Sequence, residues 1–157
     1  MALVHGIIVL DHLNDERMDH MTIVVGVDET PVAERVLRRA IEEARLRDEP
    51  LHAVHVFHPP MMYFPTTLSD PLVLEKEHRD QVWERLEPIL AGSQVEYERV
   101  DLEGYPPDTL NDYLKNVHAS LVVVGTRGRG ELSEFVLGST SHRLSHLAHC
   151  DVLIVKT

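Results

Sequence analysis

The sequence contains a single cysteine, few aromatic residues and fewer cationic than acidic side chains. One cysteine excludes a disulfide within the chain and is typical of a reducing compartment, so we expect a cytoplasmic protein. No apolar run reaches the ~20 residues that span a bilayer. Lys plus Arg number 15 against 26 for Asp plus Glu, a net charge of −11. This balance argues against binding to a nucleic-acid backbone or to an anionic membrane surface.

The length and the composition indicate one compact domain. A chain of 157 residues can bury a core of its own, and an apolar fraction of 43% is ordinary for a globular protein. The alternation of strand and helix patterns begins at residue 21, after an apolar stretch over 2–10 and a polar one over 11–20. We therefore expect an N-terminal extension over 1–20 and a single folded domain over 21–157.

The domain alternates between strand and helix patterns. Apolar or alternating runs predict five strands, over residues 22–27, 53–57, 95–100, 121–124 and 152–155. Helix starts stand at Thr30-Pro31, with Thr30 as N-cap, and at Asp70-Pro71, while Pro88 should distort or end the last turn of the second helix. Strands that alternate with helices form a parallel sheet with right-handed crossovers. The fold class is therefore α/β, a doubly wound five-stranded parallel sheet with helices on both faces.

The strand compositions indicate which strands lie inside the sheet. The runs over 22–27 and 121–124 are continuously apolar, as expected for strands that are buried on both faces. The run over 95–100 alternates between apolar and polar residues and should form an edge. We therefore expect the first and fourth strands at the centre of the sheet and the third at its rim.

A glycine-rich segment after the fourth strand is the strongest functional signal in the sequence. Two residues separate Gly125 from Gly128, nine more lead to Gly138, and Ser139 and Thr140 open a helix. Glycines at the exit of a strand let the backbone approach a ligand closely. A helix start offers free N–H groups, a hydroxyl and the positive end of the helix dipole. The segment therefore predicts a phosphate-binding loop and, with it, nucleotide binding.

Two common phosphate-binding motifs fit this segment less well. A Walker loop requires lysine before the Ser or Thr, but Gly138 precedes Ser139. The dinucleotide fingerprint would need a third glycine where Ser133 stands, and a further strand that ends in an acidic residue. The remaining alternative is a glycine-rich surface loop that is capped by Ser139.

The spacing of this segment resembles the ATP-binding branch of the universal stress protein family. The resemblance covers residues 21–157 and implies the strand order 3-2-1-4-5, in which the winding reverses between the first and fourth strands. Ligands bind at such a point, beyond the carboxyl ends of the strands, so Asp28 and Gly125 should lie in one crevice. The features that carry the resemblance are G-x2-G-x9-G-S followed by a helix, Cys150 and an apolar final strand, Asp28 after the first strand, His55-Val56 and Gly104-x-Pro106.

The resemblance and the chemistry of the side chains together imply the residues of a nucleotide site. Asp28 would accept hydrogen bonds from the adenosine end, and Val56 would contact the adenine through its backbone. Gly125 and Gly128 would let the loop approach ribose and phosphate, and Mg²⁺ would offset the repulsion between a triphosphate and nearby acidic residues. The expected nucleotide-binding set, with ATP and Mg²⁺ as cofactors, is Val27, Asp28, Val56, Gly125, Arg127, Gly128, Arg129, Gly138, Ser139 and Thr140.

The eleven histidines raise the alternative of a metal site. His142, His146 and His149 would form one stripe if the last helix continued that far, and a pair spaced by four can bind zinc. No cysteine or carboxylate clearly completes that set in the sequence, and the histidines around the second strand, among them His52 and His55, point to both of its faces. We therefore expect no metal site. No Ser-His-Asp arrangement is evident either, so we expect no catalytic residue.

The function predicted from the sequence is that of an ATP-binding regulator of a stress response, which forms a homodimer and acts on a protein partner that the sequence does not identify. The final strand, 152–155, is apolar without alternation, and the family's order places it at a sheet edge, where it would pair with a second copy. Catalysis would be limited to slow ATP hydrolysis or autophosphorylation. Two alternatives stay open: an adenylate-transfer or ATP-pyrophosphatase enzyme of similar fold, and an interaction module without nucleotide.

Overall fold

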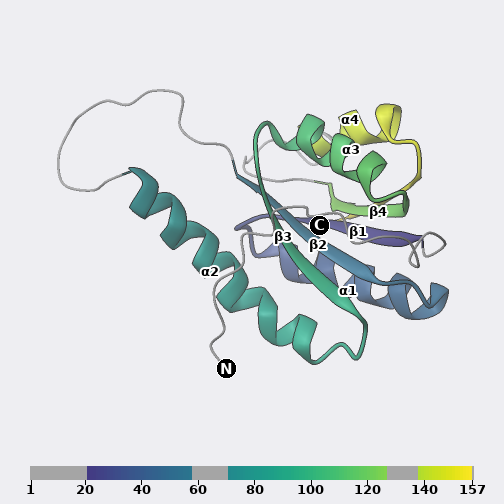
Figure 1. Ribbon diagram of the computed structural model, residues 1–157, viewed down its shortest axis with the longest axis horizontal. Coiled ribbons are helices and arrows are strands. Elements are labelled where there is room, and N and C mark those ends of the chain that lie inside the picture. Colours follow the sequence, from purple (N-terminus) through teal and green to yellow (C-terminus); the bar gives the residue numbers. More distant parts are fainter. Residues whose placement is uncertain (1–20, 58–70, 127–137, 157) are drawn as a thin grey trace, which may run out of the picture.

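A computed structural model describes residues 21–57, 71–126 and 138–156, without the side chains of 71–75. These ranges form an all-parallel sheet of five strands in the order β3-β2-β1-β4-β5 (Figure 1), which confirms the predicted fold class and strand order. The elements in chain order are β1 (Thr22–Val27), α1 (Val32–Arg47), β2 (Leu51–Phe57), α2 (Pro71–Ala91), β3 (Tyr97–Glu103), α3 (Pro106–Asn116), β4 (Ala119–Gly125), α4 (Ser139–Leu147) and β5 (Asp151–Val155).

Helices cover both faces of the sheet. α1 and α2 pack on one face, and α3 and α4 on the other (Figure 1). Because successive side chains of a strand point to opposite faces, Ile23 and Val25 of β1 enter the core beneath α1 and α2, whereas Val24 enters the core beneath α3 and α4. All three side chains are fully buried. β1 is therefore a central strand, as its apolar composition predicts.

The register of the strands brings their carboxyl ends to one edge. Val25 of β1 lies opposite Ala53 of β2 and Val123 of β4. β4 in turn places Gly125, its last residue, opposite Val155, the last residue of β5. The carboxyl ends of β1, β2 and β4 therefore all lie at the same edge of the sheet.

α2 is long, and its second half packs on the sheet. Residues 76–81 are mostly exposed, and in Figure 1 the helix accordingly begins away from the sheet and approaches it toward its C-terminal end. Pro88, predicted to distort or end the last turn of the helix, lies in that turn, and α2 continues beyond it to Ala91. Leu86 and Leu90, on either side of the proline, are fully buried, and their packing outweighs the loss of one backbone hydrogen bond.

The remaining boundaries differ from the prediction by a few residues. Thr30 is not the N-cap of α1; Pro31 takes that position, because the Thr30 hydroxyl donates to the carboxylate of Asp28 instead. The second strand begins at Leu51, and the third runs over Tyr97–Glu103. These two strands pair along their whole length, so their partner, and not their own composition alone, sets their ends.

Gly104 joins the carboxyl ends of β2 and β3. Its N–H donates to the carbonyl of Phe57 at 2.9 Å, and its φ angle is +146°. A Cβ atom at this position would stand 2.3 Å from Oγ1 of Thr109. Glycine alone adopts this backbone conformation without strain and leaves room for the threonine, so the turn into α3 depends on Gly104.

Candidate functional site

The winding of the chain reverses between β1 and β4. β1 leads into α1 on one face and then to β2, whereas β4 leads to α4 on the opposite face and then to β5. Val27 and Gly125 end these two strands, and Asp28 follows Val27 directly. The structure therefore places Asp28 and Gly125 at one edge, where sheets of this class bind their ligands.

Asp28 organises the loop between β1 and α1. Its Oδ1 atom accepts a hydrogen bond from the N–H of Thr30 at 3.0 Å and another from the hydroxyl of the same residue. Within the described part of the chain, the hydrogen bonds of this carboxylate both end on Oδ1. The second oxygen, Oδ2, can therefore meet a ligand without loss of the bonds that shape the loop.

The two valines of the expected site face opposite sides of the sheet. Val27 is only 6% exposed and belongs to the core beneath α1 and α2. Val56 is half-buried against the core beneath α3 and α4. A ligand at the edge would therefore meet Val27 through its backbone alone, whereas Val56 offers both its backbone and part of its side chain.

The two ends of the glycine-rich segment meet at the start of α4. The N–H of Gly138 donates to the carbonyl of Thr126 at 2.6 Å, and the N–H of Thr126 donates to the carbonyl of Val155 at 3.0 Å. The N–H of Gly138 is thus already used. The donors for a phosphate group would be the remaining N–H groups of the first turn of α4 and the hydroxyls of Ser139, which is exposed, and Thr140, which is half-buried.

Three of the expected ligand residues, Arg127, Gly128 and Arg129, lie outside the described residues. The part of the site that the structure describes consists of the β1–α1 loop, the ends of β2 and β4, and the first turn of α4. These pieces come from widely separated parts of the sequence, and the sheet brings them together at one edge.

One residue at this edge carries no signal in the sequence. Arg85 of α2 reaches the β1–α1 loop, and the backbone carbonyls of Asp28, Glu29 and Thr30 accept hydrogen bonds from its guanidinium group. The partners are 55 to 57 residues apart in the chain. Such a contact depends on how α2 packs against the sheet, which no local pattern reports.

A second cluster that the sequence does not reveal connects α2 to β2 and β3. His55 is 5% exposed, and its Nδ1 atom lies 3.3 Å from Oδ1 of Asp101, while Nε1 of Trp83 donates to both oxygens of that carboxylate at 3.1 Å. Burial acts to raise the pKa of Asp101, but the hydrogen bonds from His55 and Trp83 and the neighbouring positive charge outweigh it and hold the pKa below its usual value. The buried His55 is therefore a structural partner of Asp101.

The histidine stripe that the sequence suggests is interrupted. The rings of His142 and His146 lie 5.0 Å apart between their centroids, but α4 ends at Leu147, so His149 lies beyond the helix. Among the residues that the structure describes, no group of three or more His, Cys, Asp or Glu side chains could hold a metal ion.

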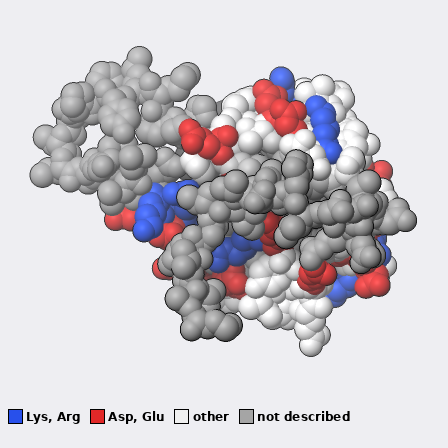
Figure 2. Space-filling model, viewed as in Figure 1, with Lys and Arg blue, Asp and Glu red and all other residues white. Residues whose placement is uncertain are grey.

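The charged side chains of the described surface are mixed in sign. Figure 2 shows acidic and basic side chains in small mixed groups rather than in one basic surface. On α1, for example, Arg39 bonds to Glu42 at 2.8 Å and to Glu43 at 2.5 Å. Exposed pairs of this kind contribute little to stability individually.

None of the helices within the described ranges has both the length and the apolar character to cross a membrane.

The fold defines an α/β protein with a doubly wound parallel sheet, whose switch point lies between β1 and β4. Comparison with known proteins makes the assignment narrower. Residues 20–156 match the universal stress protein family, and the chain belongs to that family. The family predicted from the glycine-rich segment is therefore confirmed.

The relatives include proteins of similar length and solved structures with nucleotides. A universal stress protein of Methanocaldococcus jannaschii is 29% identical over 137 residues, which span 85% of this chain and 81% of the relative. A universal stress protein from Archaeoglobus fulgidus in complex with dAMP is 30% identical, with a TM-score of 0.66 over 88% of this chain and 100% of that one. A universal stress protein in complex with cAMP shares the fold, with 24% identity and a TM-score of 0.68 over 87% of this chain and 97% of that one.

Proposed function

We propose that this protein is a nucleotide-dependent regulator of a stress response that binds ATP with Mg²⁺ at the edge formed by β1 and β4. The observation that carries the proposal is the meeting of Asp28, the end of β4 and the first turn of α4 at the switch point. The relative in complex with dAMP, at 30% identity, supports an adenine nucleotide as the ligand. The proposed setting is the cytoplasm, and the proposed assembly is a homodimer.

Each part of the edge suits one portion of the nucleotide. Oδ2 of Asp28 would accept hydrogen bonds from the adenosine end, and Val56 would line the adenine. Gly125 and the segment 127–129 would pass close to ribose and phosphate. The first turn of α4 would hold the outer phosphates, because its free N–H groups and the helix dipole favour an anion. Mg²⁺ would neutralise part of the triphosphate charge.

The proposal is one of binding rather than of rapid catalysis. A general base must lie within hydrogen-bond reach of the attacking group, whereas the proposal places Asp28 at the adenosine end of the ligand, away from the phosphates. Hydrolysis or autophosphorylation at this site would therefore be slow, and occupancy of the site by nucleotide, rather than turnover, would carry the signal.

Ligand-dependent thermal stability tests the proposal. Mg-ATP should raise the melting temperature by mass action, because it binds the folded state alone. Gly138→Val should abolish this shift by crowding the first turn of α4, while the backbone angles at Gly138, φ −61° and ψ 158°, accept a valine. Ser145→Val, an exposed position on the same helix, is the matched control and should keep the shift.

The same measurement separates the candidate ligands. AMP and cAMP are tested beside Mg-ATP, and mass spectrometry of ligand released from the purified protein identifies what it carries. Equal stabilisation of the wild type and Gly138→Val by Mg-ATP would contradict the site. A wild type that none of the three nucleotides stabilises would contradict nucleotide binding itself and would favour an interaction module.

A further inference from the structure

The guanidinium group of Arg85 is surrounded by the backbone of the loop that carries Asp28. One terminal nitrogen donates to the carbonyl of Glu29 at 2.9 Å, and the other donates to the carbonyls of Asp28 and Thr30 at 3.2 and 2.9 Å. The Nε atom lies 3.7 Å from a carboxylate oxygen of Glu34 in α1. Three consecutive carbonyls thus converge on one planar cation that is charged at every physiological pH.

Arg85 and Asp28 hold the two ends of the same peptide group. The carbonyl of Glu29 accepts from Arg85, and the N–H of Thr30, which belongs to the same peptide plane, donates to Oδ1 of Asp28 at 3.0 Å. The C=O and N–H of a trans peptide point in opposite directions. Arg85 therefore turns the carbonyl toward α2 and the N–H toward the carboxylate, and rotation of this peptide would break both bonds.

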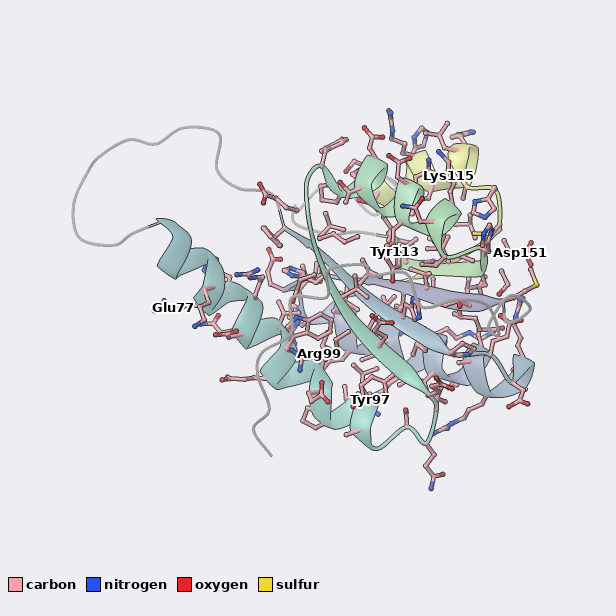
Figure 3. All side chains as sticks on the ribbon, viewed as in Figure 1. Glu77, Tyr97, Arg99, Tyr113, Lys115 and Asp151 are labelled. Carbon is pink, nitrogen blue, oxygen red and sulfur yellow. The ribbon has the colours of Figure 1, made fainter. Side chains whose placement is uncertain are left out.

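The helix that carries Arg85 is held against the sheet by other contacts. Glu87 accepts hydrogen bonds from Tyr97 and Arg99 of β3 at 2.7 and 3.0 Å, and the guanidinium of Arg99 lies 4.6 Å from the centre of the Trp83 ring. Figure 3 shows Tyr97 and Arg99 on the strand that runs beside α2. These contacts hold α2 in place on the sheet, so the position from which Arg85 reaches the loop is fixed.

We propose that Arg85 is a positioning residue of the nucleotide site, which holds the β1–α1 loop so that Asp28 meets the adenosine portion of the ligand. The inference rests on the proposed function and extends it, because it makes α2 part of the site without any contact to the ligand. Lysine cannot replace Arg85 fully, since an ammonium group lacks the planar fork that reaches three carbonyls at once.

Arg45 offers a matched control within the same chain. Its guanidinium donates to the carbonyl of Ser93 at 3.1 and 2.5 Å, so it also joins a helix to a loop carbonyl. Ser93 precedes β3 and therefore lies at the amino edge of the sheet, opposite the proposed site. Arg45→Gln removes a comparable clamp and leaves the site intact.

Isothermal titration with Mg-ATP and with magnesium inorganic triphosphate tests the proposal on the wild type, Arg85→Gln, Arg85→Lys and Arg45→Gln. Arg85→Gln should weaken ATP about tenfold or more, because hydrogen bonds that involve a charged group are the strong ones. The affinity of Arg85→Lys for ATP should lie between those of Arg85→Gln and the wild type. Arg45→Gln should leave the affinity within about twofold, and triphosphate, which lacks adenosine, should bind all four proteins alike.

A double-mutant cycle separates positioning from a general loss of stability. If Arg85 acts through Asp28, Arg85→Gln should weaken ATP no further once Asp28→Ala is present, since coupled residues are not additive. Amide hydrogen exchange at Thr30, measured without nucleotide, should become faster in Arg85→Gln and stay unchanged in Arg45→Gln.

Several outcomes would overturn the inference, and they differ from those that would overturn the proposed function. An ATP affinity for Arg85→Gln equal to that of Arg45→Gln, or fully additive losses in the cycle, would remove the positioning role while nucleotide binding by the wild type stands. If Arg85→Gln loses as much affinity for triphosphate as for ATP, the positioning role is removed as well. A wild type that binds neither ligand would overturn the proposed function and the role of Arg85 together.

Discussion

The N–H of Gly138 donates to the carbonyl of Thr126 at 2.6 Å, and this bond joins the start of α4 to the residue that follows β4. Thr126 donates in turn to the carbonyl of Val155, at the end of β5. The phosphate side of the proposed site is therefore connected through two backbone hydrogen bonds to the edge strand. The adenosine side is connected through Arg85 to α2, so the two halves of the site depend on different elements.

Substitution of Asp28 should distinguish the two ends of the ligand. Asp28→Ala removes both Oδ2, the oxygen proposed to meet the adenosine, and the bonds from Thr30 to Oδ1, so we expect ATP to bind about tenfold more weakly. The affinity for inorganic triphosphate should change little, because this ligand has no adenosine. Isothermal titration with both ligands measures the difference, and Thr30→Val, which removes the hydroxyl but keeps the N–H, is the control for loop shape. A larger loss for triphosphate would place Asp28 at the metal or the phosphates.

The apolar edge strand β5 should mediate the proposed homodimer. Val152 and Leu153 are only partly buried, and an uncovered apolar edge invites pairing with a second copy around a two-fold axis. N–H groups of successive residues in a strand point to opposite sides, so Val152→Pro and Leu153→Pro form a matched pair. One removes a hydrogen bond to β4, and the other removes the outward donor that a partner strand would use.

We expect the proline variant that loses the hydrogen bond to β4 to unfold at a lower temperature. The variant that loses the outward donor should remain folded as a monomer. Light scattering after size exclusion, with circular dichroism to confirm folding, measures both. Two folded variants that keep the mass of a dimer would place the interface away from β5. A wild type with the mass of a single chain would contradict the dimer.

The stability of the protein should fall in mild acid, partly through His52. Burial lowers the pKa of His52 and outweighs the opposite pull of the Glu98 and Glu96 carboxylates, and Nδ1 lies 2.8 Å from the hydroxyl of Tyr113. The unfolded chain therefore takes up this proton more readily than the folded protein. The stabilisation is complete above the unfolded pKa of about 6.5 and is lost as the pH falls through the lower folded value.

Thermal unfolding from about pH 7.5 to about pH 5, the range in which histidine titrates, measures this contribution. His52→Gln should show a shallower loss of melting temperature across the range than the wild type. His78→Gln, at an exposed position on α2, should follow the wild type. Parallel curves for the wild type and His52→Gln would contradict the role of His52.

Much of the fold follows from local patterns in the sequence. The apolar run of β1 predicts a strand buried on both faces, and Ile23, Val24 and Val25 are indeed fully buried. The alternating third strand lies at an edge, as expected. The spacing from Gly125 to Ser139, together with Asp28 after the first strand, resembles the universal stress protein family and predicted it correctly. Such features depend on neighbours in the chain, and the sequence by itself determines them.

Other features were decided only when distant segments packed together. Pro88 stays inside α2 because the buried side chains of Leu86 and Leu90 hold the helix on the sheet. Arg85 meets the β1–α1 loop more than fifty residues away. For Pro88, packing against the sheet outweighs a local preference of about 3 kcal/mol against proline inside a helix, and for Arg85 no local pattern reports the contact. The sequence therefore determined the strands, the glycine-rich segment and the family, whereas the tertiary structure decided which side chains support the proposed site.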